Sequence, residues 1–260
     1  SATGFKRDLY RVDGLPEDIA QSVEMKFMGM VDEGAALALA DIVEGNAEWS
    51  GRRRSDWIRF ILSLIFRNPE VVQSLKRHMA NLYREGIAVL EATYEKQRRP
   101  HDPETFEEFH SRMEPAASAK AALMLLQEVI DNPKIGPAIF KMRWHRIDLR
   151  HSKLTLVTSD RPVELNLGQG DLSYASLPVG PKLLFVADDD GRMARHVAQN
   201  DPTKIVRAIN KGTVARARRF VWGLDDGHEA LIRKWIGTGS DREIITPAQR
   251  EAALKAARGE

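Results

Sequence analysis

The 260-residue sequence contains no cysteine. This absence excludes disulfides, a thiolate nucleophile and every zinc or iron–sulfur site that is built on cysteine. It also fits a reducing compartment, and we expect a cytoplasmic protein. The histidines show neither a His-x₃-His nor a His-Glu-x-x-His spacing, and no glycine-rich phosphate loop is present. The sequence therefore predicts no metal site and no cofactor.

Long hydrophobic runs are also missing. The most apolar stretch, residues 57–66, is ten residues long and is interrupted by Arg59. A membrane-spanning helix needs about 20 apolar residues, so this stretch predicts a buried core helix. The N-terminus shows no basic-then-apolar export pattern. We expect no association with a membrane.

The sequence also lacks a large excess of positive or negative charge. The 39 basic and 37 acidic residues leave a net charge of +2, so no global field implies nucleic acid as a partner. Asp188-Asp189-Asp190-Gly191 lacks the alternating ligands and the closing glutamate of a calcium loop. We interpret it as a solvated turn.

The first half of the chain shows helical periodicity. Apolar residues at three- and four-residue spacings predict a helix from Pro16 to about Gly45, and a second one whose N-cap is Ser55. A third helix is expected from Pro69 to about Lys96, and a fourth over residues 104–131 with a break at Pro115. The third helix carries a near-heptad stripe that we interpret as a packing seam: Val72, Leu75, Met79, Leu82, Ile87, Leu90 and Tyr94.

From residue 139 the apolar period changes toward two. A strand is expected from Ile139 onward, with a bulge near His145 and an antiparallel hairpin to residues 154–158. Further elements follow: a strand over 182–187, a helix over 202–218, a strand over 220–222, a short helix over 228–236 and a terminal helix after Thr246. The pattern predicts an α+β fold, in which a helical N-terminal half packs on a mostly antiparallel sheet in the C-terminal half.

We expect one integrated domain over residues 1–260, because the sheet needs a helical cover. Within it, residues 1–135 form the helical part, residues 136–225 the mixed strand and helix part, and residues 226–260 a helical tail. An oligomer would form through the helical seam or the C-terminal helix.

Three segments resemble an uncharacterised, mainly bacterial family, domain of unknown function 4238. They are residues 156–163 (Leu-Val-Thr-Ser-Asp-Arg-Pro-Val), residues 177–185, and the helix and strand of residues 205–222, which contain Asn210. The first is similar to the family's Thr-Ser-Asp-x-Pro-Val signature. The family's upstream His-Tyr-Val-Pro segment does not occur in this chain, so a site that used its histidine would be incomplete here. The resemblance implies a fold and no particular chemistry.

Two candidate sites follow from the residues themselves. At the Thr158-Ser159-Asp160 turn, Ser159 and Asp160 with His145 or His151 would form a hydrolase-type site. The alternative is a structural turn in which Ser159 and Asp160 bond backbone amides, and no Gly-x-Ser-x-Gly elbow surrounds the serine. Whether the protein is an enzyme stays open.

The second candidate is a basic surface on the helix over 202–218 and the residues after it. We expect it to bind an anionic ligand, nucleic acid in the first place, through Lys204, Arg207, Lys211, Arg216, Arg218 and Arg219. A solvated charged face is the simpler alternative. The functions predicted are therefore a binding module for an anionic ligand, a hydrolase, or a structural and assembly protein. The sequence identifies no ligand, substrate or oligomeric state.

Overall fold

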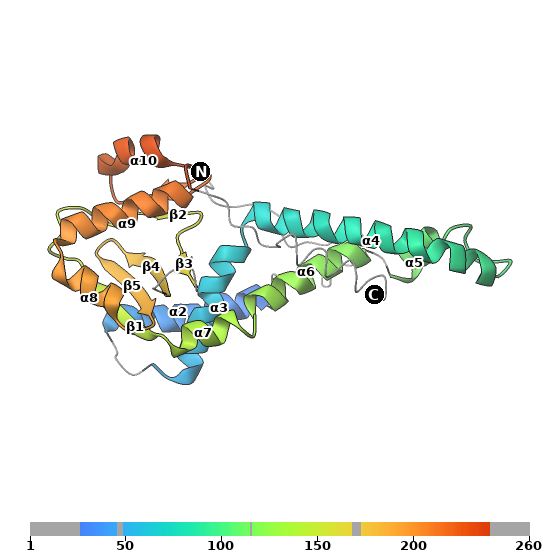
Figure 1. The fold of residues 1–260 in the computed structure, drawn as a ribbon, viewed down its shortest axis with the longest axis horizontal. Helices are drawn as coiled ribbons and strands as arrows, with labels where there is room; N and C mark the ends of the chain where they lie inside the picture. The colour runs from blue at the N-terminus through green and yellow to red at the C-terminus, as the bar shows by residue number, and fades with distance from the viewer. Residues whose placement is uncertain (1–26, 46–48, 115, 168–172, 240–260) are drawn as a thin grey trace. The chain divides into compact units, whose positions relative to one another are not determined.

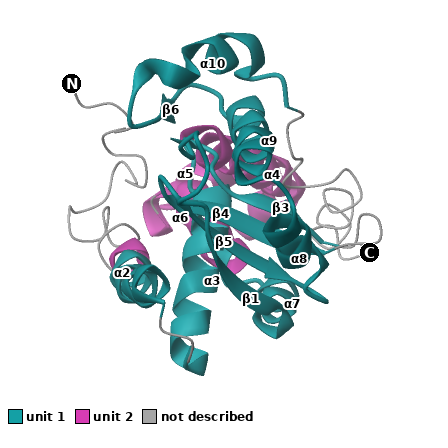
Figure 2. Ribbon diagram, turned by 90° about the vertical axis from the view of Figure 1, so that its left-hand side faces the viewer, with its two compact units in different colours: residues 1–5, 30–68, 130–241 teal, residues 6–29, 69–129, 242–260 magenta. Residues whose placement is uncertain are grey.

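The computed structural model describes residues 27–45, 49–114, 116–167 and 173–239 (Figure 1). The chain divides into two compact units (Figure 2). Unit 1 comprises residues 1–5, 30–68 and 130–241, and unit 2 comprises residues 6–29, 69–129 and 242–260. The expectation of one integrated domain stays a prediction.

Two long helices open the described part of unit 1. Helix α2 spans Gly29–Glu44 and ends before Gly45, whose φ of 81° is a left-handed conformation that glycine adopts without strain. Helix α3 spans Gly51–Phe66, and the Ser50 hydroxyl caps it by accepting the Arg53 amide at 3.3 Å. The predicted cap at Ser55 is therefore wrong. Ser55 lies inside the helix and donates to the Gly51 carbonyl.

The sheet of unit 1 has four antiparallel strands in the order β1-β5-β4-β3. They span Arg143–Asp148 (β1), Glu164–Asn166 (β3), Tyr174–Gly180 (β4) and Leu183–Asp188 (β5). A second, two-stranded sheet pairs β2 (Thr158–Ser159) with β6 (Val221–Trp222). Helices in the first half and an antiparallel sheet in the second confirm the predicted α+β class.

Both faces of the four-stranded sheet are covered by helices (Figure 2). Strand β5 is buried along most of its length, and its alternate side chains point to opposite faces. Phe185 packs against Trp57 of α3 with ring centroids 5.6 Å apart. Leu184 and Val186 belong instead to a cluster on the other face, together with Leu149, Leu156, Val197, Ile205 and Val206. Helices α8 (Arg192–Gln199) and α9 (Pro202–Arg216) are thereby fixed to the sheet by apolar contact.

The region after residue 134 differs from the sequence prediction. Residues 135–141 form helix α7 (Ile135–Lys141), and the strand begins only at Arg143. The predicted bulge near His145 is wrong, because β1 pairs with β5 without a register shift. The apolar parity changes inside β1 because both faces of the sheet are covered: Trp144 packs on Phe185, whereas Ile147 packs against the cluster on the opposite face. Among the described residues, a register shift lies between Pro178 and Gly180, where β4 pairs with β5. The predicted hairpin is also wrong, since β1 pairs with β5 and not with residues 154–158.

The end of the described chain is helical. A 3-10 turn η2 (Asp226–His228) leads into α10 (Glu229–Trp235), which packs on α9. Helix α9 ends at Arg216 with Ala217 as its C-cap, two residues earlier than predicted. The terminal helix that we expect after Thr246 lies outside the described residues.

Unit 2 contains α4 (Pro69–Gln97), α5 (Phe106–Met113) and most of α6 (Ala117–Ile130). The predicted bounds of α4 and the break near residue 115 agree with these elements. Of the predicted seam, Val72, Leu75 and Tyr94 are buried, whereas Leu90 is 48% exposed. In the part of the chain that the structure describes, no helix combines the length and the apolar character that crossing a membrane requires.

Candidate functional site

The Ser159 and Asp160 side chains of the Thr158-Ser159-Asp160 turn form hydrogen bonds with backbone groups. The Ser159 hydroxyl is buried, accepts the Arg161 amide at 3.1 Å and donates to the Thr213 carbonyl at 3.4 Å. The Asp160 carboxylate accepts the amides of Arg218 at 3.0 Å and Arg219 at 2.8 Å. The turn thus holds the end of α9 and the segment after it, and its polar groups act as a structural clamp.

The two predicted histidines do not join this turn. His145 lies on β1, where its Nε2 is 3.2 Å from Oδ1 of Asp188, a carboxylate with no solvent exposure. Asp188 also accepts the amides of Gly191 at 2.9 Å and Ala194 at 3.1 Å, so it fixes the start of α8. His151 is exposed in the turn after β1. The carboxylate that orients His145 is therefore Asp188, and the structure does not assemble the predicted hydrolase-type site.

The arginines near the end of α9 divide into structural and exposed ones. Arg216 forms an ion pair with Glu164 at 2.9 Å, and its side chain is only 20% exposed. The Arg218 guanidinium donates to the carbonyls of Gly237 at 3.1 Å and Gly239 at 3.3 Å. Arg219 is exposed beside the Phe220 ring. Arg218 and Arg219 follow the helix and are not part of its face, which corrects the expectation that Arg218 extends the helical stripe.

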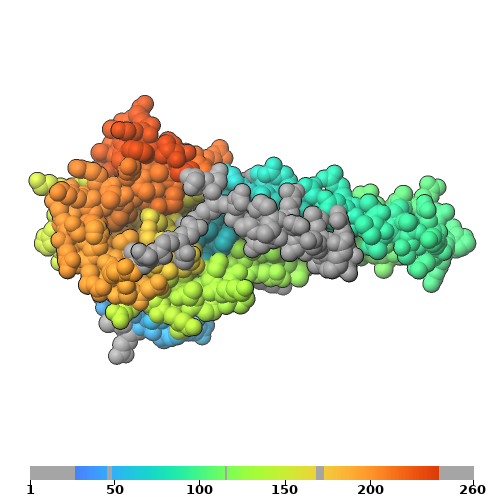
Figure 3. Space-filling view, in the orientation of Figure 1, coloured from blue at the N-terminus to red at the C-terminus, as the bar shows by residue number. Residues whose placement is uncertain are grey.

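Lys204, Arg207 and Lys211 form the remaining part of the predicted basic surface, which we call the α9 stripe. They are separated by three and four residues, so they share one face of the helix, and all three are exposed. Lys211 lies over the ring of Trp235 from α10, with its Nζ 4.0 Å from the centroid. The surface of α8 and α9 lies open to solvent in the space-filling view, where it is orange (Figure 3).

The chain segment that carries the α9 stripe has few acidic residues. Helix α9 contains four basic residues and no acidic one, and α8 before it likewise has no Asp or Glu. Asp201 is the single acidic residue between residues 192 and 219. It caps α9, and the amides of Thr203 and Lys204 that it accepts hold the pKa of its carboxyl below the ordinary value. Its charge is thus directed at the helix N-terminus.

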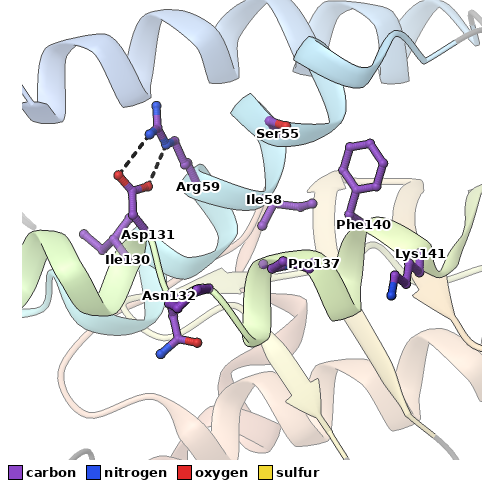
Figure 4. Close-up of a pocket in the computed structure, with 11 residues that line it drawn as sticks. Ser55, Ile58, Arg59, Ile130, Asp131, Asn132, Pro137, Phe140 and Lys141 are labelled. Carbon is purple, nitrogen blue, oxygen red and sulfur yellow. Dashed lines mark hydrogen bonds and ion pairs between the residues drawn. The ribbon is translucent and has the colours of Figure 1, made fainter.

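A groove between α3 and α7 is a second candidate, which the sequence analysis does not predict (Figure 4). Its volume is about 630 Å³. Ile58, Pro137 and Phe140 form an apolar floor, and Gly136 lies close to α3, because a Cβ at that position would be 3.8 Å from Cγ2 of Ile58. Spacings of three and four residues along α7 would identify the helix face that lines the groove, but the apolar alternation predicts a strand for residues 139–141.

The charged groups of this groove lie at its two ends (Figure 4). At one end Arg59 donates to both carboxylate oxygens of Asp131, at 2.6 and 2.9 Å, as Figure 4 shows. Arg59, the charged residue that interrupts the apolar run of α3, is thus paired with a carboxylate. At the other end stands Lys141, which is exposed and has no ion pair among the described residues.

The described residues contain no group of three or more histidine, aspartate or glutamate side chains placed to hold a metal ion. In the Asp188–Gly191 turn, the carboxylates bind protein groups. Asp188 binds backbone amides and His145, and Asp190 pairs with Arg192 at 2.6 Å. The clearest features available to a ligand are therefore the α9 stripe and the groove between α3 and α7.

The fold defines an α+β protein whose antiparallel sheet is covered by helices on both faces. A family model matches residues 1–227, and the chain belongs to that family, the proteins of unknown function designated DUF4238. No curated protein and no solved structure matches the chain. Family membership thus supplies no activity, and function has to be argued from the two surfaces described above.

Proposed function

We propose that this protein binds nucleic acid through the α9 stripe, by contacts between Lys204, Arg207 and Lys211 and the phosphate backbone. The observation that carries the proposal is the placement of three exposed cations on one face of a helix that contains no acidic residue. A cytoplasmic location, where nucleic acid is at hand, is part of the proposal.

The spacing of the stripe suits a phosphate backbone. From Lys204 to Lys211 the helix rises by about 10 Å. One DNA strand presents a phosphate about every 3.4 Å along the duplex axis, so about three phosphates lie within that length. The long side chains of lysine and arginine adjust to the remaining mismatch, since they carry their charge on flexible stems.

Trp235 adds an aromatic group at one end of the stripe. Two ammonium groups lie near its ring, that of Lys211 at 4.0 Å and that of Lys234 at 5.5 Å. Aromatic rings beside cations are typical of proteins that bind single strands, because unpaired bases stack on the ring while phosphates meet the charges. We therefore expect single strands to bind at least as tightly as duplexes of equal length.

The hydrolase-type alternative has no comparable support. The hydrogen-bonding groups of Ser159 and Asp160 are engaged with backbone, and His145 is paired with Asp188. A structural or assembly role stays a prediction.

Fluorescence anisotropy with labelled 20-nucleotide single and double strands of DNA and RNA tests the proposal. The variant is Lys204→Ala/Arg207→Ala/Lys211→Ala, and the matched control removes three exposed cations of unit 2 by Lys96→Ala/Arg98→Ala/Arg99→Ala. We expect the first variant to bind more weakly than the parent and the second to keep the affinity of the parent. Equal loss in both would mean that only net charge matters, and binding by neither parent nor control at low salt would refute the proposal. Competition with heparin distinguishes nucleic-acid binding from a general affinity for polyanions.

A further inference from the structure

The groove between α3 and α7 is built from two helical faces and one turn. Ser55, Ile58 and Arg59 of α3 contribute one wall, and Pro137, Phe140 and Lys141 of α7 contribute the other. In each set the last two residues follow the first by three and four positions, so each set forms one face of its helix. All of these residues belong to unit 1, so the groove needs no second unit to complete it.

The floor of the groove is held in place before any ligand arrives. Ile58 is 5% exposed, and its neighbour Ile130 is 1% exposed. The Phe140 ring, although 37% exposed, lies under the guanidinium of Arg54 at 5.1 Å. Arg54 is itself fixed, since it lies 4.5 Å from the Trp144 ring and donates to the Met142 carbonyl at 2.7 Å. Burial lowers the pKa of Arg54. The exposed ring is thus presented by a rigid support.

The charges of the groove favour an acidic ligand. Asp131 is neutralised locally by the two hydrogen bonds from Arg59. Asn132 is committed to the backbone, because its Oδ1 accepts the amides of Lys134 at 2.9 Å and Ile135 at 3.0 Å. Lys141 remains as a cation without an ion pair among the described residues, at the end of the groove where Phe140 lies (Figure 4).

We propose that this groove binds a small amphipathic organic acid, whose apolar body lies over Ile58, Pro137 and Phe140 and whose acidic group meets Lys141. The volume of about 630 Å³ is in the range of small-molecule sites, about 300–1,000 Å³. An apolar floor with polar groups placed around it, as in this groove, is also typical of such sites. The groove shares no residue with the α9 stripe, so this proposal and the nucleic-acid proposal can fail separately.

Two fluorescent probes with one skeleton test the proposal. 8-Anilinonaphthalene-1-sulfonate carries an acidic group, and N-phenyl-1-naphthylamine is the same ring system without it. Titration of the full chain with each probe gives a dissociation constant from the rise in emission. In the parent protein we expect both probes to bind at one site per chain.

Lys141→Gln isolates the charge. An exposed ion pair is worth up to about 1 kcal/mol, so the variant should weaken sulfonate binding about two- to fivefold and leave the neutral probe unchanged. Lys134→Gln removes a cation from an exposed position outside the groove and should change neither. An equal effect on both probes, or no effect on either, would overturn the assignment of Lys141.

Two further variants locate the apolar body. Phe140→Ala should weaken both probes about tenfold through lost apolar contact, while Leu224→Ala, at a residue that is 68% exposed, should weaken neither. Gly136→Leu fills the groove and should abolish binding of both. Unchanged affinity in Phe140→Ala and Gly136→Leu would show that the probes bind elsewhere and would refute the proposal. Circular dichroism confirms folding, and the two lysine variants keep the test decisive if Gly136→Leu does not fold.

Discussion

Replacing Asn210 by alanine is expected to destabilise unit 1 strongly. Asn210 has no solvent exposure and lies on the inner face of α9. Its Oδ1 accepts the Val157 amide at 3.0 Å, and its Nδ2 donates to the Thr155 carbonyl at 2.8 Å. The side-chain amide thus takes the place that a neighbouring strand would occupy beside residues 155–157, and it fixes α9 to this segment.

The magnitude follows from the two groups that lose their partner. The Val157 amide is buried, and leaving such a donor unsatisfied costs about 1–3 kcal/mol. The Thr155 carbonyl is partly buried and can recover a water molecule, so its loss adds about 1 kcal/mol. We expect Asn210→Ala to lower the free energy of unfolding by about 2–4 kcal/mol. Asn210→Asp should cost at least as much, because it buries a charge and presents an oxygen to the Thr155 carbonyl.

Urea unfolding followed by tryptophan emission measures this effect in unit 1 alone, since all five tryptophans lie in that unit: Trp49, Trp57, Trp144, Trp222 and Trp235. Asn200→Ala is the matched control, because it makes the same chemical change at an exposed helix end and should cost less than about 1 kcal/mol. A loss below about 1 kcal/mol for Asn210→Ala, with an unchanged dependence on urea, would refute the role assigned to this residue.

Two further perturbations have defined outcomes. Asp160→Ala removes the acceptor of two backbone amides. It should lower the free energy of unfolding in urea by about 1–3 kcal/mol and leave nucleic-acid affinity unchanged. Weaker nucleic-acid binding at unchanged stability would instead indicate a functional site at this turn. The Arg150 guanidinium and amide lower the pKa of Asp148 from 3.8 to about 2. Because the folded-state pKa is the lower one, the stabilisation is present above pH 3.8 and is lost as the pH falls toward 2. Asp148→Asn should therefore be less stable than the parent at pH 7 and approach it near pH 2, and a constant difference across this range would contradict the assignment.

The sequence predicted those parts of the fold whose cause is local. Helix α4 begins at Pro69, a residue suited to a first helical turn, and its predicted bounds agree with the structure. Residues 139–141 are helical where the sequence predicts a strand, because a short run of alternating apolar residues fits a strand and a one- to two-turn helix equally. Strand partners depend on distant segments. The amides of Leu149 and Leu156, after β1, donate to the carbonyls of Lys182 and Pro181, which directly precede β5. Pairing with such a distant segment cannot be predicted from the local pattern, which favours a hairpin between neighbouring strands.

The candidate sites show the same division. The spacing of Lys204, Arg207 and Lys211 places them on one face from sequence alone, and the structure leaves them exposed. The engagement of Arg216 by Glu164 and of Arg218 by two carbonyls depends on chain segments distant in sequence, so neither was foreseeable. The groove requires α3 and α7 to lie side by side, which no local pattern specifies.

The most direct test of nucleic-acid binding by the α9 stripe is the salt dependence of that binding. The parent and the Lys204→Ala/Arg207→Ala/Lys211→Ala variant are titrated with the same labelled strands between 50 and 200 mM salt. Three phosphate contacts contribute a slope of about −2.7 for duplex and about −2.1 for single strands to log K against log salt concentration. We expect this slope to be about two to three units less negative in the variant than in the parent. Parallel lines for the two proteins would contradict it, because the stripe would then contact no phosphate.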